Sequence, residues 1–69
     1  MGFFTKKHKN MARYNSTEEL QNGYKSSESA LRLAAYAGDM KALKNAMKVH
    51  GDYEYAMLYK KTPEYHKNK

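Results

Sequence analysis

The fold is decided by one stretch of the sequence, SALRLAAYAGD, which spans residues 29–39. Its apolar and small residues recur at the spacing of one helix face, which predicts a helix from Ala30 to Ala37. Gly38 is typical of the residue that follows a helix, because glycine adopts the left-handed backbone conformation without strain. Asp39 is a favourable N-cap for a following helix, so the stretch predicts a helical hairpin over residues 29–50.

The second helix of this hairpin, expected over residues 40–49, is amphipathic. Met40, Leu43 and Met47 share one face at spacings of three and four. The opposite stripe carries Lys41, Lys44 and Lys48. We expect the core of the hairpin to consist of small and apolar residues from both helices, namely Leu31, Leu33, Ala34, Ala35, Leu43, Ala46 and Met47.

Two further helices are predicted on either side of the hairpin. Ser16 and Glu19 have the Ser-x-x-Glu spacing of a capping box and begin a short helix, which Gly23 is expected to end. Residues 52–61 have two interpretations, because their tyrosines and Met57 alternate as in a strand while most of the stretch consists of good helix formers. We favour a short helix for this stretch.

The composition limits the protein to one small domain. The chain has 69 residues and a net charge of +6. It has no cysteine, and this excludes a disulfide scaffold, a thiol nucleophile and a zinc finger. We expect a helical domain over residues 16–61 between two flexible basic tails, residues 1–15 and 62–69. A secretory signal and a membrane-spanning apolar run are missing from the sequence, so a cytoplasmic protein is expected, or one that acts inside a host cell.

Residues 29–52 resemble an ankyrin repeat. The residues that carry the resemblance are the Leu-Ala-Ala segment at 33–35, the Gly38-Asp39 pair and Asp52, and Thr62-Pro63 follows Ser29-Ala30 at the period of the family, 33 residues. The sequence departs from the family pattern at Arg32, where the family has histidine, and at His50, where it has glycine. A plain helical hairpin with alanine-rich packing is the alternative. The resemblance implies an all-α fold that needs stacking neighbours, and therefore a protein that docks on a partner.

Catalysis is not indicated by the sequence. None of the three histidines lies at helical ligand spacing from another histidine, and His66 and Glu64, two places apart, do not share a helix face. A glycine-rich phosphate loop is also missing from the sequence. We therefore expect no enzyme activity, no metal and no cofactor. The mixture of seven tyrosines with eleven lysines instead favours binding.

A protein partner is the favoured interpretation, with the chain acting as a small accessory subunit of a larger assembly. Binding to RNA or to a ribonucleoprotein is the alternative, which is less favoured because arginine is scarce and RNA-binding motifs are missing. Association with a membrane surface is the least favoured of the three. The candidate partner-binding residues lie on the second helix of the hairpin and in the segments beside it: Tyr36, Lys41, Lys44, Tyr53, Tyr55 and Tyr59.

Overall fold

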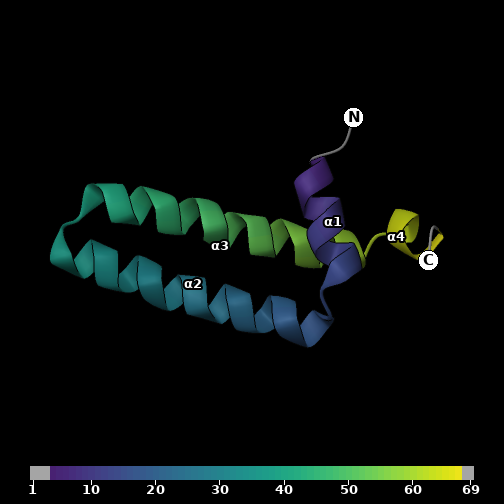
Figure 1. The fold of residues 1–69 in the computed structure, drawn as a ribbon, viewed down its shortest axis with the longest axis horizontal. Helices are drawn as coiled ribbons and strands as arrows, with labels where there is room; N and C mark the ends of the chain where they lie inside the picture. Colours follow the sequence, from purple (N-terminus) through teal and green to yellow (C-terminus); the bar gives the residue numbers. More distant parts are fainter. Residues whose placement is uncertain (1–3, 68–69) are drawn as a thin grey trace.

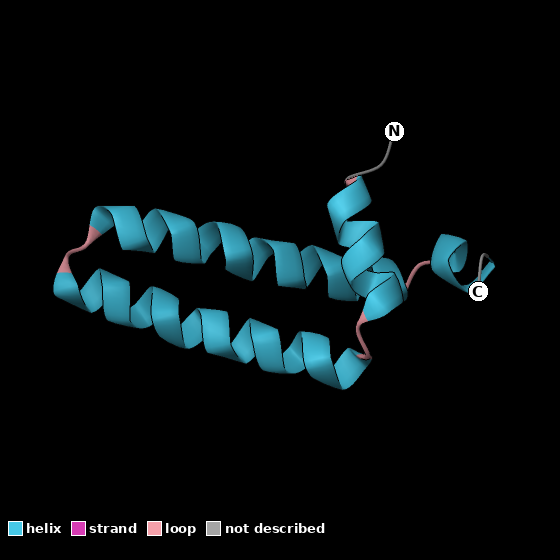
Figure 2. Ribbon diagram, in the orientation of Figure 1, coloured by secondary structure: helices cyan, strands magenta, loops and turns pink. Residues whose placement is uncertain are grey.

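The computed structural model describes residues 4–67, and these residues form an all-α fold, as predicted from the sequence. The described part of the chain contains no strand (Figure 2). Its helices are α1 (Lys6–Tyr14), α2 (Thr17–Ala37), α3 (Met40–Lys60) and α4 (Pro63–Lys67). None of the helices between residues 4 and 67 is long and apolar enough to cross a membrane.

Helices α2 and α3 form a long antiparallel hairpin, and the turn between them is the one that the sequence predicts (Figure 1). Gly38 has a φ of 73°, in the left-handed region that glycine reaches most easily. Asp39 caps α3, because its side chain accepts a hydrogen bond from the backbone N–H of Ala42 at 3.1 Å. The two residues therefore end one helix and begin the next within a single tight turn.

Helix α2 is longer than the sequence predicts. It begins as expected, with a capping box in which Ser16 and Glu19 exchange bonds of 2.7 and 3.1 Å. The prediction that Gly23 ends this helix is wrong, because α2 continues without a break to Ala37. Gly23 lies against the ring of Tyr53, so its missing side chain serves the packing of α2 on α3 and does not mark a helix end.

Helix α3 also joins two predicted helices into one. It runs through Gly51, and the ambiguous stretch from residue 52 onward is helical, so the strand interpretation is excluded. Asp52, one of the residues that carry the ankyrin resemblance, lies inside this helix and binds two side chains of α1. Packing along a long hairpin offsets the cost of one glycine in a helix interior, about 1 kcal/mol.

Most of the predicted basic tail over residues 1–15 is helical. Thr5 caps α1 and His8 completes the capping box, which explains why a helix begins there. α1 crosses α3 near the end at which α4 begins (Figure 1), and the ring of Phe4 lies 5.3 Å from that of Tyr59. Part of the predicted C-terminal tail, residues 62–69, is likewise helical, because Pro63 begins α4 and the Tyr59 hydroxyl donates to Glu64 at 3.1 Å.

The core lies mostly where α1 meets the hairpin. The buried apolar residues are Ala12, Leu20, Ala34, Ala56 and Tyr59. Of the predicted core residues only Ala34 is buried; Leu31, Leu43 and Ala46 are half-buried, while Leu33, Ala35 and Met47 are exposed. Two helices bury only one narrow seam between them, so an apolar residue outside that seam stays in contact with solvent.

Candidate partner-binding surface

The half of the hairpin nearest its turn, residues 30–48, exposes large apolar side chains; we refer to it as the hairpin tip. Neither α1 nor α4 lies over it (Figure 1). The exposed apolar residues of the tip are Leu33 (72%), Tyr36 (95%), Met40 (71%) and Met47 (56%). Leu33 and Tyr36 share one face of α2, and Met40 and Met47 share one face of α3. Exposed apolar patches on a small protein are typical of interaction sites.

The seam of the hairpin explains this exposure. At the tip, α2 and α3 meet through Leu31, Ala34, Leu43 and Ala46, of which Ala34 is buried and the others are half-buried. The alanine side chains of the seam are short, and a hollow of about 480 Å³ between α2 and α3 is lined by Ala46 together with Ala30 and Ala42. The larger apolar residues of the tip lie outside the seam, where they are exposed.

A groove on α3 collects several of the apolar residues of the tip. It has a volume of about 520 Å³ and is lined by Met40, Leu43 and Met47 together with Lys41 and Lys44. Lys48 follows one turn further along the helix. None of the three Lys or Arg ion pairs between residues 4 and 67 involves these three lysines. The groove thus combines a flexible apolar floor with a positively charged edge.

The candidate residues from the sequence divide into two groups. Tyr36, Lys41 and Lys44 lie together at the exposed tip. Tyr53, Tyr55 and Tyr59 lie in the other half of the hairpin, where each packs within the molecule. Their neighbours are Gly23 for Tyr53, the rings of Phe4 and His8 for Tyr55, and the rings of Phe4 and Tyr65 for Tyr59.

Tyr59 is the most strongly held of these tyrosines. Its side chain is buried, and burial together with the hydrogen bond that it donates to Glu64 raises the pKa of its hydroxyl. Lys9 of α1 binds the same carboxylate at 3.2 Å, and the bonds from Lys9 and Tyr59 lower the pKa of Glu64. Tyr59 therefore helps to join α1, α3 and α4.

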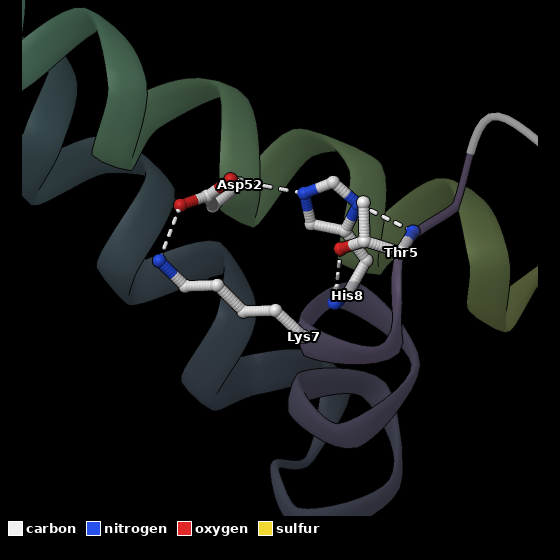
Figure 3. Close-up of polar contacts among 4 residues, drawn as sticks. All are labelled: Thr5, Lys7, His8 and Asp52. Atoms are coloured by element: carbon white, nitrogen blue, oxygen red, sulfur yellow. Dashed lines mark hydrogen bonds and ion pairs between the residues drawn. The ribbon is translucent and has the colours of Figure 1, made fainter.

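A polar cluster with His8 at its centre fixes α1 to α3 (Figure 3). The Nε2 atom of His8 lies 2.9 Å from Oδ1 of Asp52, and the Nζ atom of Lys7 lies 2.8 Å from Oδ2. Nδ1 of the histidine accepts a hydrogen bond from the backbone N–H of Thr5 at 3.2 Å. The ring proton is therefore on Nε2, which donates a hydrogen bond to the Asp52 carboxylate. Burial acts to raise the pKa of Asp52, but the hydrogen bonds from Lys7 and His8 outweigh burial and lower it.

This cluster has the residue types of a hydrolytic triad without its geometry. The Thr5 hydroxyl accepts the backbone N–H of His8 at 3.3 Å and makes no bond to the imidazole ring, so the ring does not act as its base. Both ring nitrogens are occupied by helix capping and by Asp52. The arrangement serves to dock α1. The sequence signal for it is the Thr-x-x-His spacing, a capping box with histidine in place of Glu or Gln.

A second hollow lies where α2, α3 and α4 meet, with a volume of about 550 Å³. Its walls include Tyr24 and Leu58, and Lys61 and His66 lie at its edge. Among residues 4–67, no group of three or more histidines and acids could hold a metal ion. Thr17, Glu54 and His66 also line the hollow, and none of the side-chain hydrogen bonds between residues 4 and 67 joins them to one another.

Comparisons with known proteins give no relative. No family model matches the chain, and neither the curated proteins nor the solved structures contain a significant match.

Proposed function

We propose that this chain is a non-enzymatic protein–protein interaction module, an accessory subunit that docks on a larger partner through its hairpin tip. The exposure of Leu33, Tyr36, Met40 and Met47 is the observation that carries this proposal. Tyrosine and methionine suit such a role, since tyrosine provides large rigid contact area and methionine adapts to an irregular surface. The resemblance of residues 29–52 to an ankyrin repeat supports the same class of function.

The internal contacts of the histidine and carboxylate side chains also support a docking role over catalysis. The buried His8 and the half-buried Asp52 bind each other and hold α1 in place. The tip offers apolar side chains and lysines, which suit binding to a surface but not acid–base chemistry at neutral pH.

RNA binding is the second candidate, and the unpaired lysines of the tip are the observation that favours it. Lys41, Lys44 and Lys48 are all exposed on α3. Lysines that neutralise phosphates give an affinity that falls steeply with salt, by roughly 0.7 log units per log unit of salt for each contact with a single strand. A protein complex held by desolvated apolar anchors depends much less on salt.

The test is affinity capture with the tagged full chain, with and without nuclease, followed by salt washes. Tyr36→Ala is the test variant. Tyr14→Ala is its matched control, because Tyr14 is 75% exposed but lies at the end of α1, away from the tip. We expect a defined protein partner that resists nuclease and salt and is lost only from Tyr36→Ala. Capture that nuclease abolishes, or that both variants retain equally, contradicts the proposal.

A further inference from the structure

Gly51 has no role inside the molecule, unlike the other glycines that the structure describes. Gly38 adopts a positive φ at the turn, and a side chain on Gly23 would collide with the ring of Tyr53. A Cβ atom built on Gly51 meets nothing within 4 Å, although this residue lies in the middle of α3. Glycine is among the least favourable residues in a helix interior, so its presence here weakens the helix without improving its internal packing.

Gly51 belongs to an exposed stripe that runs the length of α3. Met40, Met47, Gly51 and Leu58 follow one another at spacings of seven, four and seven, which places them on one face of the helix. We call these four residues the outer stripe. Its three large side chains are between 46% and 71% exposed.

The other faces of α3 are already in use. Towards α2 it presents His50, whose ring lies 4.2 Å from that of Tyr24, and Tyr53, which contacts Gly23. Towards α1 it presents Asp52. From Met40 to Gly51 the outer stripe thus lies on a face of α3 that neither α1 nor α2 covers, and Leu58 at its far end also lines the hollow where α2, α3 and α4 meet.

The combination of a bare glycine with larger apolar residues suits a helix as the occupant. A glycine lets the backbone of a second helix approach closely, while Met47 and Leu58 on either side pack against its side chains. RNA would need aromatic rings or guanidinium planes on which bases stack, and the stripe has neither. A lipid surface gains from buried apolar area, which glycine does not supply.

The charge beside the outer stripe defines the chemistry of that helix. Lys41, Lys44 and Lys48 lie along the tip half of α3, and no ion pair between residues 4 and 67 neutralises them. The acids within α3 are Asp52, which binds His8 and Lys7, and Glu54, and both lie beyond the tip half of the helix. A partner with carboxylates opposite the tip half is therefore electrostatically complementary.

We propose that the outer stripe receives an acidic amphipathic helix of a partner protein, with its closest approach at Gly51. This inference rests on the proposed function and names the partner class for it. The apolar face of the partner helix packs on Met40, Met47 and Leu58, and its acidic flank faces the lysines of the tip.

The test uses synthetic peptides and the full chain. The probe is a helical peptide with leucine at heptad spacing and glutamate on its flanks. Its controls are a scrambled peptide of the same composition and a peptide with lysine in place of glutamate. A single-stranded RNA oligonucleotide and anionic vesicles are tested beside them. Binding is measured by fluorescence anisotropy, or by sedimentation for the vesicles.

Two substitutions of the glycine separate binding from folding. Gly51→Ala is expected to raise the melting temperature by a few degrees, since alanine favours the helix and nothing obstructs its Cβ. Gly51→Leu is expected to keep the helical circular dichroism and to weaken binding of the acidic peptide at least tenfold. Asn22→Leu, an exposed change on α2, is the matched control and should leave binding unchanged.

Several results would overturn the inference. The first is that the scrambled or the lysine peptide binds as tightly as the acidic peptide. The second is that RNA or vesicles bind more tightly than the acidic peptide. The third is that Gly51→Leu binds the acidic peptide as tightly as the parent chain does. If Gly51→Leu has no effect but Tyr36→Ala still loses the captured protein, the inference fails and the proposed function stands. If neither variant alters capture, both fail.

Discussion

Removing the Asp52 carboxylate should release α1 from the hairpin. Asp52 accepts hydrogen bonds from His8 at 2.9 Å and from Lys7 at 2.8 Å. A hydrogen bond to a charged group contributes about 1.5–3 kcal/mol, and the exposed Lys7 lies at the low end of this range. Asp52→Ala also leaves the buried Nε2–H of His8 without an acceptor. We expect a loss of about 2–3 kcal/mol, out of a total stability of roughly 3–10 kcal/mol for a chain of this length.

The assay is urea unfolding followed by circular dichroism, together with a thermal melt. The expected loss corresponds to a melting temperature lower by about 10–20 °C for a domain of this size. Glu28→Ala is the matched control, because it removes only the exposed pair with Arg32 and should cost less than about 0.5 kcal/mol. If Asp52→Ala unfolds like the parent and like Glu28→Ala, the cluster does not hold α1.

The same carboxylate predicts a dependence on pH. The folded pKa of Asp52 lies below its unfolded value. Its contribution to stability is therefore fully present above the unfolded pKa, about 3.9, and is lost as the pH falls through the folded value. Unfolding of the parent and of Asp52→Asn at neutral and acid pH measures this contribution. The difference in stability between the two proteins should shrink on acidification, and a constant difference would contradict the assignment.

Three further predictions concern packing. Leu20→Ala removes a fully buried side chain and should cost about 2–5 kcal/mol, enough to unfold much of the chain, as measured by circular dichroism. Gly23→Ala should lower the midpoint of urea unfolding by an amount equivalent to about 1–3 kcal/mol, because the new methyl group collides with the ring of Tyr53; an unchanged midpoint would argue against this contact. His50→Leu should raise the melting temperature, because Nε2 of this histidine is buried without a partner; a lower melting temperature would mean that the nitrogen is satisfied in solution.

The turn and the first caps could be read from the sequence because they depend on local chemistry. Gly38 and Asp39 need only their own backbone preferences to end one helix and begin another. Ser16 and Glu19 satisfy each other across three residues. Such features are decided within one turn of helix, so a single sequence is enough to predict them.

The helix lengths could not be read in the same way. The sequence predicts a helix end at Gly23 and separate helices over residues 40–49 and 52–61, on either side of Gly51, but both glycines lie inside long helices. A glycine costs a helix about 1 kcal/mol, which tertiary packing overrides. For Gly23 the reason is Tyr53, a residue 30 positions away in sequence that local patterns do not connect with it.

The candidate site shows the same limit. Met47 and Leu33 have the apolar character of core residues, and they were assigned to the core from their spacing. They are exposed because the two helices meet through alanine and half-buried leucine along one seam, and no third helix covers the tip. His8 went unnoticed because its partner, Asp52, lies 44 residues further along the chain.

Photo-cross-linking determines whether the hairpin tip is a protein-binding surface. The photo-reactive residue p-benzoylphenylalanine replaces Met47 at the tip or, as a control, Tyr14 on α1; both positions are exposed. After irradiation in nuclease-treated extract, we expect a discrete protein adduct from position 47 that position 14 does not give and that an excess of unmodified chain suppresses. The same adducts from both positions, or none from position 47, would show that the tip does not bind a protein.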